Sequence, residues 1–202
     1  IEQPDADAFV WSKAKTMKRL YFKNACYFVT TNPIDRIEFF EEDLISDIFI
    51  KTMKISIELK HAYLVGYKVN PDHIHLIIHV GSAFNISEIM HSIKRVSSDK
   101  INQILFCNRD PNPYEHFHWD EWLTKSKEKF LANYGQQNNH PFPQFKWQPS
   151  FHDNLIRSAK ELNSRFEYLR KQHFKHELTE NKWLFISDNI PPNINYVGPK
   201  RT

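Results

Sequence analysis

The chain has 202 residues, of which 41% are hydrophobic and 25% charged, and this composition predicts one soluble globular domain with a substantial core. Only four glycines stand against sixteen phenylalanines, which argues against a glycine-rich nucleotide-binding fold, and a net charge of +3 is too small to indicate a nucleic-acid binder by itself. No apolar run approaches the ~20 residues that a membrane span needs. The two distant cysteines and the lack of a signal-peptide pattern predict a reducing cytoplasm.

The first hundred residues predict the element order βαββα. The predicted elements are a strand at 25–31, a helix at 41–60, strands at 62–69 and 73–80, and a helix that begins after Asn85. Asn32-Pro33 ends the first strand, and Asn70-Pro-Asp72 has the composition of a turn that joins the next two strands into a hairpin. Glu88, three residues after Asn85, indicates a capping box.

The remainder of the chain divides into an insertion, a late helix and a tail. Residues 106–146 mix proline, asparagine, glutamine, histidine and aromatic residues, which predicts an inserted loop or helical region. Ser158 and Glu161 indicate the start of a helix that runs to about residue 173, and residues 188–202 predict an extended tail. Gln172 follows Tyr168 four positions later, so both side chains should lie on one face of this helix.

The most informative residues are His73 and His75, inside the predicted strand 73–80. Because a strand alternates its side chains, both imidazoles should point to one face while Ile74 points to the other. Two neutral imidazoles on Cα atoms about 7 Å apart can converge on one divalent ion. The pair is half of a metal site, with a solvated polar stripe as the alternative. His79 lies on the same face as a further polar group.

A second histidine pair lies at His116 and His118, inside the insertion. No apolar strand pattern surrounds it, so a polar loop is the favoured interpretation.

The charges are unevenly distributed along the chain. A basic segment at 13–23 lacks acidic residues, and an acidic cluster lies at 35–47. Basic side chains recur later at Lys94, Arg95, Arg157, Lys160, Arg165, Arg170, Lys171 and Lys175. A basic face opposite an acidic one would suit a phosphate ligand, and a mixed solvated surface is the alternative.

This ordered set of parts resembles the single-tyrosine HUH transposases, including the REP-associated tyrosine transposases. The resemblance rests first on Asn70-Pro-Asp-His-Ile-His-Leu-Ile-Ile78 and on Phe166-Glu-Tyr-Leu-Arg-Lys-Gln172. Shorter matching segments lie at 92–95, 147–148, 152–157 and 161–162. The resemblance extends over residues 20–105 and 146–185, which is most of the chain.

The resemblance implies an α+β fold, a ferredoxin-like or RRM-like αβ sandwich around a central antiparallel sheet. One such domain would occupy residues 1–202, with the insertion at 106–146 and the tail at 188–202. It further implies that His73, His75 and Gln172 bind a divalent metal, Mg²⁺ or Mn²⁺, and that Tyr168 is the nucleophile. In this family the tyrosine takes the 5′ phosphate of single-stranded DNA, usually beside a hairpin, and leaves a free 3′ hydroxyl.

Basic residues on the two later helices are the expected DNA contacts. These are Lys94, Arg95, Arg157 and Arg170. Trp119, Trp122 and Trp147 are further candidates, because exposed aromatic rings stack on unpaired bases. Relatives include both dimers and monomers, so a homodimer is left open.

Two other functions remain as alternatives. A metal-dependent phosphodiesterase could use His73, His75 and His79 with an activated water and no covalent step. A DNA-binding module descended from a transposase could keep the fold without the chemistry. Tyr114 and Tyr134 are rival tyrosines, provided that the insertion folds over the metal site.

Overall fold

The computed structural model describes residues 21–109, 111–114, 116, 118–135, 140–178 and 181–196. Most of the basic segment 13–23 lies outside the described residues. The elements are β1 (Cys26–Thr31), η1 (Ile34–Arg36), η2 (Phe39–Glu41), α1 (Asp43–Leu59), β2 (Tyr63–Asn70), β3 (His73–His79), α2 (Ile86–Leu105), α3 (Glu121–Tyr134), β4 (His152–Ile156), α4 (Ala159–Arg170), α5 (Gln172–Lys175) and β5 (Leu184–Ile186), where η1 and η2 are short 3-10 helices.

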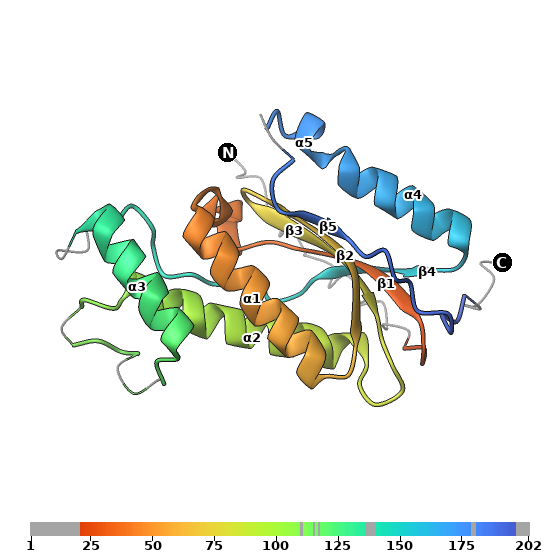
Figure 1. The fold of residues 1–202 in the computed structure, drawn as a ribbon, viewed down its shortest axis with the longest axis horizontal. Coiled ribbons are helices and arrows are strands. Elements are labelled where there is room, and N and C mark those ends of the chain that lie inside the picture. The colour runs from red at the N-terminus through yellow and green to blue at the C-terminus, as the bar shows by residue number, and fades with distance from the viewer. Residues whose placement is uncertain are drawn as a thin grey trace, which may run out of the picture.

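The strands form one five-stranded antiparallel sheet in the order β4-β1-β3-β2-β5. Helices α1 and α2 cover one face of this sheet, and α4 with α5 covers the other (Figure 1). The predicted αβ sandwich with a central antiparallel sheet is therefore confirmed, as is the order βαββα. The two edge strands, β4 and β5, were not predicted, because strands of five and three residues are too short to show an alternating pattern.

Strand β3 is the middle strand of the sheet, and all seven of its residues are buried. Ile74, Leu76 and Ile78 join the core under α1 and α2, whereas Ile77 joins the core under α4. Because side chains alternate along a strand, the histidines of β3 share the face of Ile77. The predicted division of this strand into two faces is confirmed, and the polar face lies beneath a helix rather than in solvent.

The caps predicted from the sequence set the starts of α2 and α4. The side chain of Asn85 accepts hydrogen bonds from the backbone of Ser87 and Glu88, and Glu88 accepts one from the backbone of Asn85, which completes the capping box. Ser158 caps α4 by accepting from the backbone of Glu161. Each cap satisfies backbone N–H groups that have no partner within the helix.

The insertion thickens the layer formed by α1 and α2. It contains α3, which packs against these two helices, and beyond it Phe145 and Trp147 join Phe40 and Phe49 in a buried aromatic cluster. The amide of buried Asn102 holds this segment, because it donates to the carbonyl of Phe145 at 2.9 Å and accepts from its N–H at 2.8 Å. The insertion therefore builds on the face of the sheet opposite α4.

The described part of the tail returns to the sheet. Ile194 is buried in the core under α4, and the backbone N–H of Asn195 donates to the carbonyl of Asn24 at 2.6 Å. Residues 197–202 lie outside the described residues.

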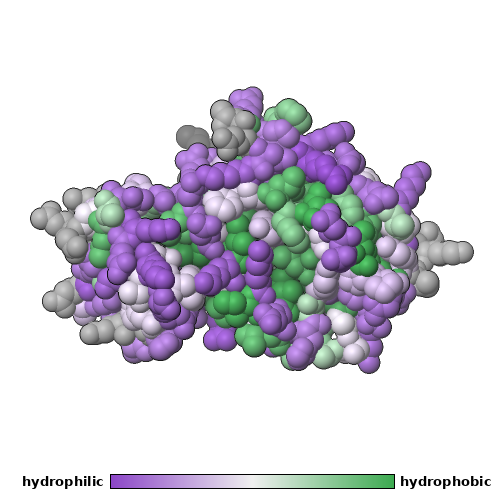
Figure 2. Space-filling model, in the orientation of Figure 1, coloured by the Kyte–Doolittle hydropathy of each residue, from purple (hydrophilic) through white to green (hydrophobic). Residues whose placement is uncertain are grey.

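Apolar side chains gather on one part of the surface, over the β2–β5 edge of the sheet between α1 and α4, whereas α3 and α4 present polar side chains (Figure 2). Across the described ranges, no helix is both long and apolar enough to span a membrane.

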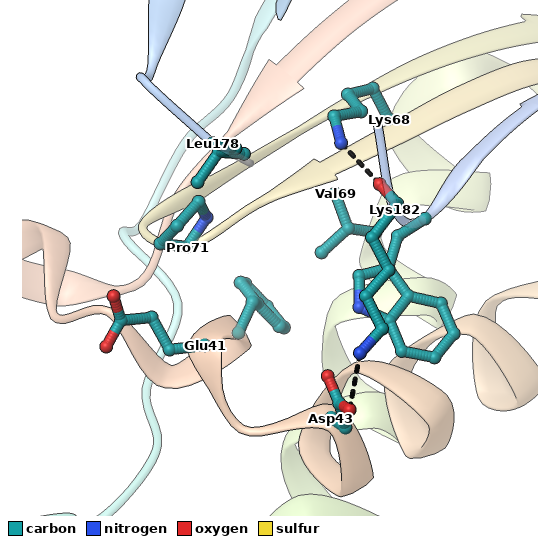
Figure 3. Close-up of a pocket in the computed structure, with 9 residues that line it drawn as sticks. Glu41, Asp43, Lys68, Val69, Pro71, Leu178 and Lys182 are labelled. Atoms are coloured by element: carbon teal, nitrogen blue, oxygen red, sulfur yellow. Dashed lines mark hydrogen bonds and ion pairs between the residues drawn. The ribbon is translucent and has the colours of Figure 1, made fainter. Parts of the chain in front are cut away.

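Lys68 on β2 is a fully buried lysine, and it ties the short strand β5 to the sheet. Its ammonium group donates to the carbonyl of Lys182, and the ammonium group of Lys182 pairs with Asp43 at the start of α1 (Figure 3). These residues line a pocket of about 530 Å³ beside Pro71. Burial lowers the pKa of Lys68 from 10.5 to about 8.

This pKa predicts that Lys68 makes folding stability depend on pH. Between pH 8 and 10.5 the unfolded chain keeps a proton on Lys68 that the folded chain has released, so the free energy of unfolding should rise with pH in this window. Lys68→Met should remove this rise, because methionine does not titrate. Urea unfolding of both proteins at several pH values measures it. Lys182→Met, at a half-exposed lysine, is the control; the same pH dependence in wild type and Lys68→Met would contradict the prediction.

Candidate active site

His73 and His75 lie side by side on the face of β3 that α4 covers. Their Nε2 atoms are 3.2 Å apart, and both side chains are more than nine-tenths buried. Pairing with the neighbouring strands sets Asn70 of β2 opposite His73 and Thr30 of β1 opposite His75. The predicted convergence of the two imidazoles is what the strand geometry produces.

The outer nitrogens of the two rings are held by side chains on adjacent elements. Nδ1 of His73 lies 2.5 Å from a carboxylate oxygen of Asp72, whose other oxygen is held at 2.6 Å by Arg36. Nδ1 of His75 lies 2.9 Å from the hydroxyl of Thr30. Because a carboxylate can only accept, Nδ1 of His73 carries the proton and its Nε2 presents a lone pair toward His75.

The electrostatics of the site keep both imidazoles neutral. Burial, reinforced by neighbouring His73, lowers the pKa of His75 from 6.5 to about 3. Burial also lowers the pKa of His73, although Asp72 opposes this shift. Burial raises the pKa of Asp72, but hydrogen bonds from His73 and Arg36 outweigh it, so the pKa falls below its usual value of 3.8. Two neutral imidazoles beside an ionised carboxylate have the protonation states of metal ligands.

The junction of α4 and α5 brings Gln172 to the histidines. The backbone of Lys171 stays in the helical region, so the chain continues its helical course across the break. Gln172 is buried, its Oε1 lies 3.2 Å from Nε2 of His75, and its Nε2 donates to the carbonyl of Tyr168 at 3.4 Å. This second contact turns the oxygen of the amide, rather than its nitrogen, toward the histidines.

Tyr168 lies one helical turn before Gln172, at the rim of the site. Its ring meets the ring of His75 edge-on, with centroids 5.2 Å apart, and it meets Phe28 in the same way at 5.6 Å. The side chain is partly exposed, and its hydroxyl has no hydrogen-bond partner among the residues that the structure describes. The phenol is therefore held by its ring, while its oxygen is available to a substrate.

The donor set formed by these side chains fits a divalent cation. Nε2 of His73, Nε2 of His75 and Oε1 of Gln172 follow one another at 3.2 Å. Ligand atoms bound about 2.1 Å from one ion lie about 3.0 to 3.4 Å apart, so this spacing suits atoms that share a metal. Within the described ranges no group of three or more His, Cys, Asp or Glu side chains is arranged to hold a metal, and beside the two histidines the nearest further donor atom of this set is the amide oxygen of Gln172.

The rival histidines do not join this site. His79 lies four residues beyond His75 on β3, which is about 13 Å along a strand, and it faces Cys26 across the sheet. His118 is exposed and lies 3.4 Å from a carboxylate oxygen of Asp120. The metal ligands of the phosphodiesterase alternative are thus not gathered at one place.

The rival tyrosines pack on the other side of the sheet. The hydroxyl of Tyr134 donates to Glu42, and its ring contacts Phe130 of α3. Tyr114 packs against Phe106 at the end of α2, with ring centroids 5.7 Å apart. The insertion does not bring either tyrosine to His73 and His75.

The basic residues predicted to contact DNA fall on two faces of the molecule. Arg157 and Arg170 lie at either end of α4, on the side of Tyr168, whereas Lys94 and Arg95 lie on α2, across the sheet (Figure 1). Lys94 connects α2 to the segment before β4, because its ammonium group donates hydrogen bonds to the carbonyls of Gln148 and Ser150. Lys94 and Arg95 also line a groove of about 760 Å³ between α2 and residues 144–151.

The three tryptophans that were predicted to stack on bases pack against the core, and they differ in how deeply they are buried. Trp147 is buried in the aromatic cluster and donates from its ring nitrogen to Ser97 at 3.0 Å. Trp119 and Trp122 are partly buried against the same core, and a lysine ammonium lies over each ring.

Several residues around the metal site escaped the sequence analysis. Asn70 and Asp72 stand in the same short motif as the histidines, so their position in the sequence was a usable signal. Thr30 and Arg36 carry no such signal, because only strand pairing and the fold of the β2–β3 turn bring them close. His176 was also missed; its ring packs against that of His73 with centroids 4.9 Å apart.

Comparisons with known proteins identify the family and the fold of this chain. The family described as Transposase IS200 like matches residues 21–127, which is just over half of the chain. Among solved structures, a REP-associated tyrosine transposase bound to a REP hairpin gives a TM-score of 0.51 at 16% identity, over 81% of this chain and 74% of that one. At this identity the likeness concerns the fold.

A second solved structure is that of a protein from Deinococcus radiodurans R1 that is provisionally described as a transposase. It gives a TM-score of 0.42 at 13% identity, over 80% of this chain and 98% of that one. A search of curated proteins gives no match. The family match covers the strand with the two histidines and the helix α2 that follows it. The chain therefore belongs to the family of IS200-like transposases, enzymes of DNA transposition that cleave and rejoin DNA.

Proposed function

We propose that this protein is a metal-dependent transposase that nicks single-stranded DNA and transfers strands through a 5′-phosphotyrosine intermediate. The proposed nucleophile is Tyr168, and the proposed metal ligands are His73, His75 and Gln172. The observation that carries the proposal is the position of Tyr168, whose ring lies against that of His75 with its hydroxyl free of hydrogen bonds to described residues. All four side chains meet within the one chain that the structure describes.

The ligands would give the cation a neutral environment. Two imidazoles and an amide oxygen carry no charge, so a bound Mg²⁺ or Mn²⁺ would keep its full positive charge. When bound, the cation polarises the scissile phosphate and offsets its developing negative charge. Asp72 and Thr30 hold the two imidazoles in the orientation that this task needs.

Tyr168 would then cleave the DNA strand as the nucleophile. Its oxygen forms a bond to phosphorus as the bond from phosphorus to the 3′ oxygen breaks. The phenol loses one proton and the departing 3′ oxygen gains one, so the step is balanced without another reactant. One phosphodiester bond replaces another, and a second 3′ hydroxyl can attack the phosphotyrosine to rejoin the strand. No nucleotide cofactor is required.

Single-stranded DNA beside a hairpin is the proposed substrate. The structural neighbour was solved with a REP hairpin, and this supports the same class of ligand for a chain of similar fold. Arg170, two positions after Tyr168 on α4, and Arg157, just before the start of α4, are the proposed contacts for the cleaved strand, while Arg95 and Lys94 would contact DNA that reaches the groove along α2.

One prediction of this proposal concerns the nucleophile. Labelled single-stranded hairpin DNA, incubated with the protein and Mg²⁺ or Mn²⁺, should give a covalent protein–DNA band on a denaturing gel. Tyr168→Phe should abolish this band, because it removes only the attacking oxygen and keeps the ring that packs on His75 and Phe28. His75→Ala should abolish it through loss of the metal.

Tyr134→Phe is the matched control, and it should leave the covalent band at wild-type intensity. Cleavage that survives Tyr168→Phe without a covalent band would favour a hydrolase that uses water. Metal-dependent binding with no cleavage of DNA drawn from the flanks of the gene would favour the DNA-binding module without chemistry.

A further prediction concerns the proposed DNA contact at Arg157, just before α4. Arg157 is partly exposed beside the start of α4, and a guanidinium group keeps its positive charge and suits contacts with phosphate oxygens. Arg157→Gln should weaken binding of single-stranded DNA about equally for all sequences, and it should reduce the slope of log K against log salt by about 0.7. Fluorescence anisotropy across a salt series measures both quantities.

Lys125→Gln is the control for this measurement, since Lys125 pairs with Glu121 on α3, away from α4. An unchanged salt slope in Arg157→Gln would show that this arginine makes no phosphate contact.

A further inference from the structure

Asn70, the last residue of β2, lies at the centre of the candidate metal site. Its side chain is 1% exposed, and strand pairing sets it opposite His73. Its Nδ2 atom is 3.0 Å from Nε2 of His73 and 3.5 Å from Oε1 of Gln172. Its own oxygen, Oδ1, is buried and has no hydrogen-bond partner among the described residues.

Four polar side chains thus close a ring. His73 meets His75, His75 meets Gln172, Gln172 meets Asn70, and Asn70 returns to His73, with distances between 3.0 and 3.5 Å. Atoms that bind one cation about 2.1 Å away lie about 3.0 Å apart in an octahedral arrangement and about 3.4 Å apart in a tetrahedral one. The ring therefore has the size of one coordination sphere, and Asn70 occupies its fourth place.

The two amides of the ring differ in how they are held. Nε2 of Gln172 donates to the carbonyl of Tyr168, which fixes Oε1 toward the histidines. Nothing comparable holds Asn70, because its Oδ1 has no partner in the described part of the chain and its Nδ2 contacts only atoms of the ring. An amide can exchange its nitrogen and oxygen by a half-turn with almost no change in shape.

We infer that Asn70 is a fourth protein ligand of the divalent cation, through Oδ1, and that its amide turns over when the cation binds. Without the cation, the NH₂ group donates to lone pairs of His73 and Gln172; with the cation, these lone pairs bind metal and the amide presents its oxygen instead. The inference rests on the proposed function, in which His73, His75 and Gln172 hold the metal.

The test is Mn²⁺ binding to the full chain without DNA, measured by electron paramagnetic resonance and by isothermal titration calorimetry. Asn70→Asp keeps the shape, offers oxygen only, and should lower the Kd for Mn²⁺ at least tenfold. Asn70→Leu keeps the size but offers no ligand, and it should raise the Kd at least tenfold. If Asn70 served only as a hydrogen-bond donor to these lone pairs, Asn70→Leu would free them for the cation and would not raise the Kd, and this result would overturn the inference.

Asn154→Asp is the matched control for charge. Asn154 lies exposed on β4, on the same face of the sheet, so it adds the same negative charge outside the ring. Its Kd should stay within about twofold of wild type. A decrease as large as that of Asn70→Asp would assign the gain to general electrostatic attraction and overturn the inference.

His75→Ala separates the inference from the function on which it rests. Loss of Mn²⁺ binding in His75→Ala, together with an unchanged Kd in Asn70→Leu, would overturn the role of Asn70 and leave the proposed metal site intact. Mn²⁺ binding that survives His75→Ala unchanged would contradict the metal site itself, and the role of Asn70 would fall with it. Thermal unfolding with and without Mn²⁺ verifies that each variant is folded, and Mn²⁺ should stabilise Asn70→Asp more than wild type.

Discussion

The burial of β3 on both of its faces is the constraint on which the site depends. A central strand covered by helices on each side requires partners for most of its buried polar groups, because an unpaired one is costly. His73 and His75 meet this requirement with their outer nitrogens, on Asp72 and Thr30. Their inner nitrogens lie 3.2 Å apart, beside the amide groups of Gln172 and Asn70, and this cluster of donor atoms suits a cation.

The same burial explains the chemistry that the site can perform. Desolvation holds the two imidazoles neutral, and Arg36 helps to keep Asp72 ionised, so the site has the protonation states that the proposed metal ligands need. Helix α4 then serves two purposes. It covers the polar face of β3 with Leu162, Phe166 and Leu169, and its last turn carries Tyr168 to the rim. One helix therefore covers the strand and positions the proposed nucleophile, and its register on the sheet sets the distance from the phenol to the histidines.

The two faces of the sheet have separate tasks. The face under α1 and α2 holds the larger apolar core, and the insertion enlarges it with α3 and an aromatic cluster that Asn102 fixes in place. The other face holds a smaller apolar core beside the polar site. This separation allows an insertion of some forty residues without displacing Tyr168 from the histidines, since the added chain packs behind the sheet.

The sequence by itself determined the alternation that directs His73 and His75 to one face, the capping of α2, the four-residue spacing of Tyr168 and Gln172, and the family resemblance. These features are local, and periodicity or short spacing reports them. Only the tertiary structure decided which elements cover each face, that the insertion lies away from the site, and that Thr30, Arg36 and Asn70 surround the histidines. Those contacts join residues on different strands and turns, and strand order and register, which local sequence does not encode, bring them together.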